Sequence, residues 1–209
     1  MKILELFAGS RSFSKAAEKL GHETFSVDIK DFENIDYVVD VLDFDYSKIP
    51  FKPDIIWASP PCTYFSVASI GKHWYKDNTA KTEQALLGCK IVKKTLEIIK
   101  HFNPDYYFIE NPRGKLRKLD FMQELDRATV TYCQYGDTRM KPTDIWTNYL
   151  KNIFNPHGWN PKQICKNGDN CHVSAPRGSK TGTQGLKGNY LRSIVPEELC
   201  LEILKSIKL

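Results

Sequence analysis

The sequence contains no apolar segment long enough to cross a membrane as a helix, and no signal peptide precedes the first apolar run. We therefore expect a cytoplasmic protein with no membrane partner, whose six cysteines are reduced. A strong charge of one sign is also lacking. The net charge of +5 allows a polyanionic partner without requiring one. The length of 209 residues suffices for one domain with a sizeable core.

The three-glycine fingerprint of dinucleotide-binding proteins is missing from the N-terminal strand–turn–helix–strand pattern. Gly9 allows a close backbone approach in the first turn, but Ser10 and Ser12 stand where further glycines would be. Ser12 is expected to be the N-cap of the helix. Asp28 ends the second strand, where a carboxylate can accept hydrogen bonds from ribose hydroxyls. The motif is therefore a weak signal for a dinucleotide, and an ordinary strand–helix turn accounts for it equally well.

A rigid turn follows the apolar run at residues 54–58, which predicts a buried strand. Pro60 and Pro61 end that strand and fix the path of the turn, and the next side chain is the thiol of Cys62. A thiol at the carboxyl edge of a strand lies where open α/β sheets carry out their chemistry. A small buried loop cysteine is the alternative.

Strands and helices alternate over the first 110 residues, which predicts an α/β fold with a mostly parallel sheet and helices on both faces. Polar residues 66–82 are expected to form a mobile loop that closes over a substrate. The other expected elements are strands at 2–6, 23–28, 37–41, 105–109, 128–133 and 143–147, the last two antiparallel, and helices at 12–20, 83–102 and 196–207. The helix at 83–102 is expected to use as its core face Leu86, Leu87, Ile91, Leu96, Ile98 and Ile99.

Three stretches, in this order, resemble the DNA cytosine-C5 methyltransferases. Phe7-Ala8-Gly9 is similar to that family's S-adenosylmethionine loop, Pro61-Cys62-x-x-x-Ser66 to its nucleophile loop, and Glu110-Asn111 to its catalytic pair. The chain resembles a short member of the phage or bacterial type. The resemblance implies an enzyme with a Rossmann-like S-adenosylmethionine-dependent methyltransferase fold and a small irregular recognition insert. It implies S-adenosyl-L-methionine as the cofactor and double-stranded DNA as the partner.

The resemblance also implies the residues of the cofactor site. Asp40 stands where the family has an acid that reaches the adenine amino group, and Gly188-Asn189 resembles the pair before the family's last helix. That helix completes the cofactor pocket in the family. The implied cofactor-binding residues are Phe7, Ala8, Gly9, Ser10, Asp28, Ile29, Asp40, Val41, Pro61 and Asn189.

The candidate catalytic and DNA-binding residues follow from the same resemblance and from the positions of basic side chains. The family has a Tyr-Gly turn followed by two arginines, and this chain has Arg139 and Lys141, with Thr143-Asp144 in the later position. Arg113 opens a basic run that can contact phosphates, and a solvated loop is the alternative. The candidate catalytic residues are Cys62, Glu110, Asn111 and Arg139, and the candidate DNA-binding residues are Ser66, Arg113 and Lys141.

The chemistry explains why these residue types are needed. Carbon C5 of cytosine is a poor nucleophile, and a thiolate that adds to C6 turns C5 into an enamine carbon able to attack an electrophilic methyl group. A carboxyl group such as Glu110 can assist at N3 and the exocyclic amine. Asn111 would orient the loop. In duplex DNA the base must leave the stack to be reached.

The recognition region is short for the family that the chain resembles. We expect a catalytic core at residues 1–148, a small target-recognition segment at 149–187 and a C-terminal helix at 188–209 that completes the core. Residues 149–187 lack hydrophobic periodicity, whereas family members usually carry a substantial recognition domain here. This favours a short recognition site, loose specificity or a partner protein.

Cysteine and histidine gather in the same segment, where no apolar core is evident. In a reducing compartment such a cluster suggests zinc more than a disulfide. Cys165, Cys171 and His172 supply three candidate ligands, and His157 or Cys133 is the candidate fourth.

Three alternative functions stay open. Ser59-Pro60-Pro61 resembles the Ser-Pro-Pro-Tyr motif of N4-cytosine amino-group methyltransferases, although Cys62 stands where those enzymes need an aromatic residue. A non-catalytic DNA- or cofactor-binding module of the same fold is the second. A C5 enzyme that uses a modified cofactor or a free nucleotide is the third.

Overall fold

The computed structural model describes residues 1–166, 168–173 and 188–207. The strands are β1 (Lys2–Leu6), β2 (Glu23–Asp28), β3 (Tyr37–Val38), β4 (Ile55–Ala58), β5 (Tyr106–Pro112), β6 (Arg127–Thr131) and β7 (Pro142–Thr147). The α-helices are α1 (Ser12–Lys19), α2 (Ile70–His73), α3 (Glu83–Phe102), α4 (Asp120–Gln123), α5 (Asn189–Ser193) and α6 (Glu197–Ser206). Short 3-10 helices are η1 (Val41–Asp43), η2 (Tyr46–Lys48), η3 (Leu116–Lys118) and η4 (Tyr132–Tyr135).

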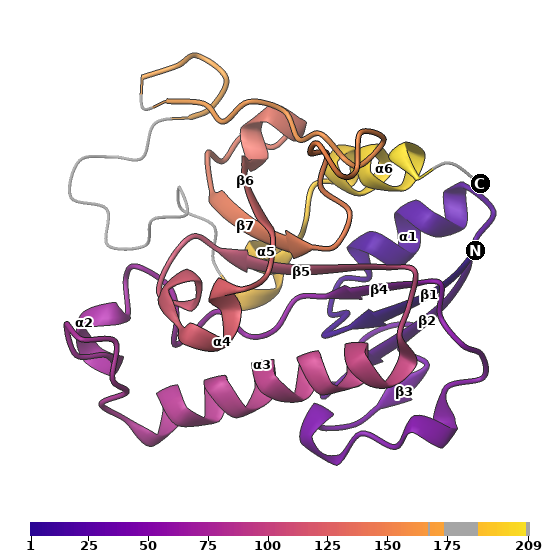
Figure 1. Ribbon diagram of the computed structural model, residues 1–209, viewed down its shortest axis with the longest axis horizontal. Coiled ribbons are helices and arrows are strands. Elements are labelled where there is room, and N and C mark those ends of the chain that lie inside the picture. Colours follow the sequence, from indigo (N-terminus) through magenta and orange to yellow (C-terminus); the bar gives the residue numbers. More distant parts are fainter. Residues whose placement is uncertain (167, 174–187, 208–209) are drawn as a thin grey trace.

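The described strands form a seven-stranded sheet in the order β3-β2-β1-β4-β5-β7-β6 (Figure 1). Strands β1 to β5 are parallel, and β7 is antiparallel to both of its neighbours. The predicted α/β class with a mostly parallel sheet is confirmed. The third strand is shorter than expected, because η1 begins at Val41.

Alternate residues of the central strands pack on opposite faces of the sheet, as the period of two requires. Ile55 and Trp57 of β4 belong to the core that α1 and α6 cover, whereas Ile56 belongs to the core that α3 covers. Figure 1 shows α3 on one side of the sheet and α1 with α6 on the other. Phe13 of α1 stacks on Trp57 with ring centroids 4.5 Å apart. Both residues belong to the core to which α6 also contributes, so the C-terminal helix packs beside the first helix of the chain.

A buried carboxylate, and not Ser12, caps the start of α1. Oε1 and Oε2 of Glu5 accept hydrogen bonds from the backbone N–H groups of Phe13 and Ser14, at 3.2 and 2.8 Å. Burial raises the pKa of Glu5, and these two hydrogen bonds act against that rise. The expectation that Ser12 is the N-cap is wrong, because the chain enters the helix from a left-handed Arg11 and Glu5 reaches the free N–H groups from β1.

Helix α3 buries a different face from the one expected from its leucines. Its buried residues include Val92, Ile98 and Ile99, but Leu86 and Leu87 are 53% and 40% exposed. The expected core face is therefore wrong in its first turns. This exposure leaves Leu87 facing a pocket described below.

Residues 66–82 pack more closely than the mobile loop that their polarity suggests. The segment contains the short helix α2, and both His73 and Trp74 are buried. Nε1 of Trp74 donates a hydrogen bond to the carbonyl of Tyr64 at 2.6 Å, and Nδ1 of His73 lies 2.7 Å from the Thr82 hydroxyl. The first contact holds the segment against the loop that follows β4, and the second joins two residues within the segment.

Strand β7 carries a fully buried acid with basic partners. Asp144 is 0% exposed and accepts hydrogen bonds from the guanidinium of Arg117, at 2.8 Å from Nε, and from the hydroxyl of Thr129 at 2.8 Å. The guanidinium of Arg127 lies 3.9 Å away. Asp144 therefore links β7 to β6 and to the loop after β5.

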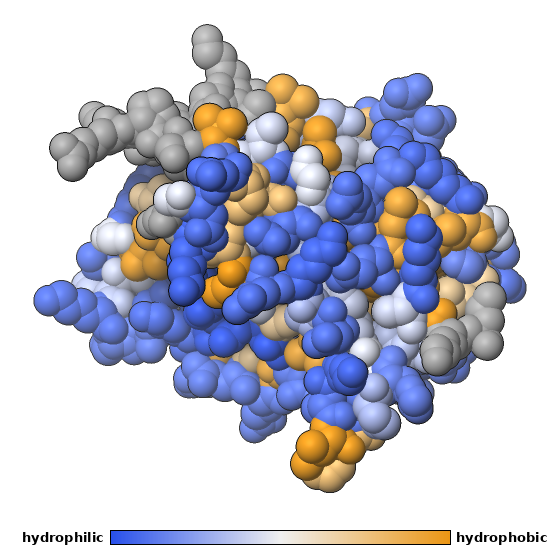
Figure 2. Space-filling model, turned by 90° about the horizontal axis from the view of Figure 1, so that it is seen from above, coloured by the Kyte–Doolittle hydropathy of each residue, from blue (hydrophilic) through white to orange (hydrophobic). Residues whose placement is uncertain are grey.

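The face of the molecule seen in Figure 2 is mostly hydrophilic, with apolar groups in separate small areas. Among the described residues, no helix combines the length and the apolar character that a membrane span needs.

Replacing Arg117 by Met should destabilise the fold strongly. The change leaves the Asp144 carboxylate buried without its main cationic partner, which typically costs about 3–5 kcal/mol. Urea denaturation followed by circular dichroism measures the loss. The matched control is Lys118→Met at the neighbouring exposed position, with an expected change below about 0.5 kcal/mol. An Arg117→Met protein as stable as the control would contradict this account of Asp144.

Candidate active site

The carboxyl ends of β1, β2, β4 and β5 meet at one edge of the sheet, because these strands are parallel neighbours. The turn after β1, Asp28 at the end of β2, the loop after β4 and Glu110 in the last part of β5 are thus brought together. The sequence predicts this meeting, since each motif follows an apolar run.

A mainly apolar pocket opens at this edge. It contains most of the predicted cofactor residues, together with apolar side chains of α3 that the sequence analysis assigned to the core. The pocket is lined by Leu6, Phe7, Val27, Asp28, Ile29, Val39, Asp40, Val41, Pro61, Leu87 and Ile91. Leu87 and Ile91 were missed as pocket residues, because helical periodicity cannot separate a face that packs on the sheet from one that lines a ligand site.

The turn after β1 is held in an unusual conformation. Phe7 and Arg11 have positive φ angles of 58° and 54°, and Gly9 has a φ of 47°. Such angles are costly for a bulky residue and are found where surrounding contacts impose them. Oδ2 of Asp28 accepts a hydrogen bond from the Gly9 N–H at 2.9 Å, and Ala8 N–H donates to the carbonyl of Val27 at 3.0 Å. The end of β2 thus shapes the turn.

The two pocket carboxylates each cap a backbone N–H and keep further acceptor capacity. Oδ1 of Asp28 accepts a hydrogen bond from Lys30 N–H at 2.9 Å, and Oδ1 of Asp40 accepts one from Leu42 N–H at 3.0 Å. Their orientation is therefore fixed before any ligand binds. The remaining predicted cofactor residues Ala8, Gly9 and Ser10 lie in the neighbouring turn, and the side chain of Asn189 lies outside the described residues.

The loop that carries Cys62 is fastened to β5. Nδ2 of the fully buried Asn111 donates a hydrogen bond to the carbonyl of Pro60 at 2.8 Å. The Cys62 carbonyl accepts hydrogen bonds from the N–H groups of Phe65 and Ser66, both at 3.0 Å. These bonds close a tight turn directly after the thiol. Cys62, half-buried, is thereby held at a fixed position beside the end of β5.

Glu110 is 5% exposed and has polar partners on one oxygen. Its Oε1 accepts a hydrogen bond from the hydroxyl of Tyr132 at 2.8 Å, and Nζ of Lys141 lies 3.7 Å from the same atom. Burial and the neighbouring Glu110 carboxylate raise the pKa of Tyr132 well above its usual range. Tyr132 was missed by sequence reasoning, because nothing in its local pattern distinguishes it from a core residue.

Opposing charges act on the thiol of Cys62. Burial is the largest influence and raises its pKa, and the negative charge of Glu110 raises it further. The positive charges of Lys141 and Arg192 act in the opposite direction. Arg192, from the short helix α5, is a second residue that the sequence analysis missed; its place just after Gly188-Asn189 was the available signal.

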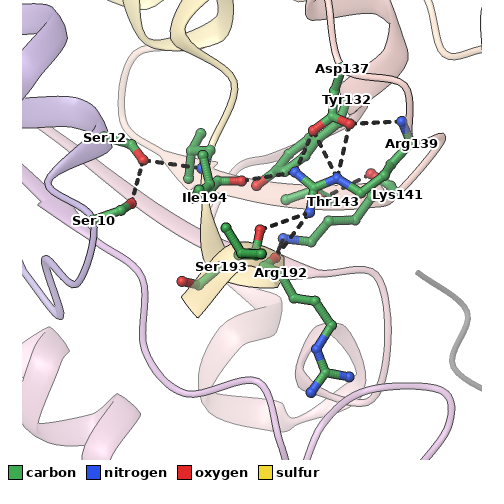
Figure 3. Close-up of polar contacts among 12 residues, drawn as sticks. Ser10, Ser12, Tyr132, Asp137, Arg139, Lys141, Thr143, Arg192, Ser193 and Ile194 are labelled. Atoms are coloured by element: carbon green, nitrogen blue, oxygen red, sulfur yellow. Dashed lines mark hydrogen bonds and ion pairs between the residues drawn. The ribbon is translucent and has the colours of Figure 1, made fainter. Parts of the chain in front are cut away.

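Arg139 contacts the C-terminal part of the chain, and its catalytic role stays a prediction. Its guanidinium pairs with Asp137 and donates hydrogen bonds to the carbonyls of Leu191, Arg192 and Ile194 at 3.4, 3.3 and 3.2 Å (Figure 3). Two of these carbonyls belong to α5 and the third follows it. Arg139 therefore braces the C-terminal segment, and Lys141 is the basic residue beside Glu110.

Helix α5 and the segment after it are tied to both sides of the site. Nζ of Lys141 donates to the Arg192 carbonyl at 3.2 Å, and the N–H of Val195 donates to the Ser12 hydroxyl at 3.2 Å. The Ser12 hydroxyl in turn lies 2.8 Å from that of Ser10 (Figure 3). Ser10 and Ser12 thus connect the turn after β1 to the residues that follow α5.

The structure places the other predicted DNA-binding residues near the same edge. Ser66 forms an isolated antiparallel bridge with Gly114, and its hydroxyl lies 3.1 Å from that of Ser69. A Cβ on Gly114 would meet the Phe65 carbonyl oxygen at 2.2 Å, so this approach requires glycine. Arg113 is exposed beside it. The contact of Ser66 and Arg113 with DNA stays a prediction.

The predicted metal ligands come together with one exception. Cys165, Cys171 and His172 gather with Cys133 from η4, and their ligand atoms all lie within 4.8 Å of one another. His157 is exposed and lies outside this cluster, on a turn where its carbonyl accepts a hydrogen bond from the Tyr149 hydroxyl at 3.0 Å. Of the two candidates for the fourth ligand, Cys133 therefore lies in the cluster and His157 does not.

The chain is similar to known proteins over most of its length. Residues 1–131 match the family described as C-5 cytosine-specific DNA methylase. A Frog virus 3 (isolate Goorha) protein named "Probable DNA (cytosine-5)-methyltransferase" is 34% identical over 222 residues, which cover 98% of this chain and 99% of that protein.

A solved structure shares the fold, and a second matches with a lower score. An E. coli protein described as a "putative DNA modification methyltransferase encoded within prophage" matches with a TM-score of 0.53 and 14% identity, over 79% of this chain and 52% of that one. A Spodoptera frugiperda DNMT2 mutant matches with a TM-score of 0.45 and 20% identity, over 70% of this chain and 49% of that one. The chain thus spans about half the length of these solved proteins. Together with the match over residues 1–131, the near full-length relative shows that the chain belongs to the C-5 cytosine-specific DNA methylases, a family of methyltransferase enzymes.

Proposed function

We propose that the chain transfers a methyl group from S-adenosyl-L-methionine to C5 of a flipped-out cytosine in double-stranded DNA, through a covalent bond between Cys62 and C6. The observation that carries the proposal is the placement of the Cys62 thiol. It is fixed through the Asn111–Pro60 hydrogen bond beside Glu110, and Pro61, the residue before it, lines the pocket of the cofactor residues.

The pocket fits the proposed cofactor in its chemistry. Apolar side chains such as Val39, Leu87 and Ile91 suit the face of a purine ring, and Asp28 and Asp40 can accept hydrogen bonds from ribose hydroxyls and the adenine amino group. The tight turn at Gly9 allows the backbone to approach without a phosphate cradle. When bound, S-adenosylmethionine supplies the electrophilic methyl group that the enamine carbon attacks.

Cys62 supplies the electron pair for the first step. Its sulfur forms the bond to C6, and the electrons of the C5–C6 double bond move toward C5. C5 would then take the methyl group from S-adenosylmethionine, whose sulfur keeps the electrons of the broken S–CH3 bond and leaves as S-adenosylhomocysteine. Loss of the C5 proton to a base and release of the sulfur restore the aromatic ring. The thiolate is needed for attack, so the charges of Lys141 and Arg192, which favour it, assist the reaction.

Glu110 assists at the opposite side of the ring. The contacts with Tyr132 and Lys141 both fall on Oε1, which leaves Oε2 for the ring. N3 of cytosine is an acceptor, so Glu110 must act there as a carboxylic acid that donates its proton, whereas the exocyclic amine donates to a carboxyl oxygen. Donation of a proton to N3 draws electron density away from C6 and favours addition of the thiolate. Tyr132 and Asn111 act as positioning residues for the carboxylate and for the nucleophile loop.

Access to this site requires base flipping. Glu110 is buried and Cys62 is half-buried, so a base that remains stacked in duplex DNA cannot bring C6 to the thiol. Lys141 is positioned to hold O2 or a phosphate of the flipped nucleotide, with Ser66 and Arg113 at the rim. We infer that residues 149–187 form the recognition segment, with a partner protein as an additional source of specificity; residues 167 and 174–187 lie outside the described part.

The amino-group alternative is disfavoured. It requires an aromatic residue to stack on the base at the position of Cys62, and it gives Glu110 and its partners no role. A non-catalytic module is also disfavoured, because the thiol, the carboxylate and the pocket are all kept together.

Cys62 should form a trapped complex with DNA that contains 5-fluorocytosine. Fluorine replaces the C5 proton that must leave, so the methylated adduct cannot resolve. A denaturing gel should show the adduct only when S-adenosylmethionine is present, and Cys62→Ser should abolish it, whereas Cys89→Ser in α3 should not. Trapping that persists in Cys62→Ser would assign the nucleophile to another residue.

Lys141→Gln should move the reactivity of Cys62 to higher pH. Lys141 lowers the pKa of the thiol, so removing its charge raises that pKa and reduces the thiolate present at a given pH. The rate of iodoacetamide alkylation at Cys62, followed by peptide mass spectrometry over a pH series, measures the shift. Lys141→Arg should keep the profile close to that of the parent. Identical profiles for the Gln variant and the parent would show that Lys141 does not affect the pKa of the Cys62 thiol.

Asp28→Ala should weaken S-adenosylmethionine binding by about 1–3 kcal/mol, because it removes a ribose acceptor and the hydrogen bond to Gly9 N–H. Titration calorimetry without DNA measures this directly. Asp31→Ala, three residues later and exposed, is the matched control. Equal affinities for the two variants would place the ribose contact elsewhere.

A further inference from the structure

The cluster of Cys133, Cys165, Cys171 and His172 joins two distant parts of the chain. Cys133 lies in η4, directly after β6, and the other three lie in the irregular segment before residue 174. Cys133 and Cys165 are buried, His172 is half-buried and Cys171 is exposed. Three thiols and an imidazole are a donor set typical of structural zinc.

Most distances in the cluster are close to those of one tetrahedral ion. With Zn–S bonds of about 2.3 Å and Zn–N bonds of about 2.0–2.1 Å, a tetrahedral site has S···S edges of about 3.8 Å and S···N edges of about 3.6 Å. The Sγ atom of Cys133 lies 3.1 Å from that of Cys165 and 3.6 Å from that of Cys171. Nδ1 of His172 lies 3.7 Å from Sγ of Cys165 and 3.5 Å from Sγ of Cys171. Three of these four distances are close to the tetrahedral edges, and the Cys133–Cys165 distance is shorter, so those two sulfurs must move apart to admit the ion.

The segment that provides three of these ligands lacks an apolar core of its own. Among the described residues from 160 to 173, Cys165 is the sole buried side chain. A segment this polar buries too little surface to offset the entropy of ordering, so a cross-link is needed to hold it in place.

Neighbouring hydrogen bonds complete the setting. Cys165 N–H donates to the hydroxyl of Thr131 at 3.1 Å, and Val173 N–H donates to the carbonyl of Thr138 at 3.0 Å. Nε2 of Gln134 lies 3.4 Å from Sγ of Cys171, where an amide donor stabilises a metal-bound thiolate. The segment is thus docked along β6, η4 and the turn that follows.

We propose that Cys133, Cys165, Cys171 and His172 bind one structural Zn²⁺ ion, which fastens residues 165–172 of the proposed recognition segment to the turn that carries Tyr132 and Arg139. The ion takes three thiolates and a neutral imidazole, so binding releases the thiol protons to solvent. Four protein ligands close the coordination shell, and the site is structural. Cys133 directly follows Tyr132, the residue that donates to Glu110, so the ion ties the segment to the wall of the active site.

Elemental analysis of the full chain tests the proposal without any measurement of methyl transfer. Protein expressed with added zinc and purified without chelator should carry about one zinc per chain. Cys171→Ser, an exposed ligand whose loss opens no cavity, and Cys133→Ser should each lose it. Cys89→Ser and His157→Asn are the matched controls and should keep it. Cobalt-loaded parent protein should show thiolate-to-cobalt charge transfer and tetrahedral visible bands, absent from Cys171→Ser.

Hydrogen exchange tests the fastening role. Removal of zinc with a chelator, or the Cys171→Ser change, should speed exchange at the amides of Cys165 and Val173 and leave β1 unchanged. Three results overturn the proposal: protein without zinc, zinc retained equally in Cys171→Ser, or a Cys133–Cys165 disulfide in mass spectra of alkylated protein. Zinc loss without faster exchange at these amides would overturn the fastening role.

Discussion

The hydrogen bond from Asn111 to the carbonyl of Pro60 is the contact on which the active site depends. Parallel pairing of β4 and β5 brings the two loops to one edge of the sheet, but pairing alone leaves the path after β4 undefined. The buried amide sets that path, and the two prolines allow it few alternatives. As a result, the thiol of Cys62 and the carboxylate of Glu110, the residue before Asn111, are positioned by the same two strand ends.

A second constraint closes the site from the C-terminal end of the chain. Arg139 is 5% exposed and binds three carbonyls in α5 and directly after it, so it acts on the site through the backbone. Helix α5 contributes Arg192, whose charge favours the Cys62 thiolate, and the residues after it are bonded to Ser12. The two basic residues of this turn therefore have different contacts: Arg139 binds backbone carbonyls near the C-terminus, and Lys141 lies beside Glu110. Asp144, in the later position of that turn, pairs with Arg117 and stabilises the sheet.

The sequence predicted the sheet, the order of its motifs and most of the pocket, because these depend on apolar periodicity and on residues adjacent to strand ends. It predicted less where a role depends on contacts between distant residues. The local pattern does not distinguish the roles of Arg139 and Lys141. In the structure Arg139 pairs with Asp137, whereas Lys141 lies beside Glu110. Leu87 has the spacing of a core residue but lines the pocket. Cys133 precedes Cys165 by 32 residues, so no spacing rule selects it over His157.

The position of the methyl group in DNA tests the central claim most directly. Nucleoside mass spectrometry, paired with bisulfite sequencing, on DNA from cells that express the chain identifies both the modified atom and the target sequence. The account predicts 5-methylcytosine in DNA from cells with the parent protein and none from cells with Cys62→Ser. Methylation at the exocyclic nitrogen of cytosine, or 5-methylcytosine that persists with Cys62→Ser, would contradict it.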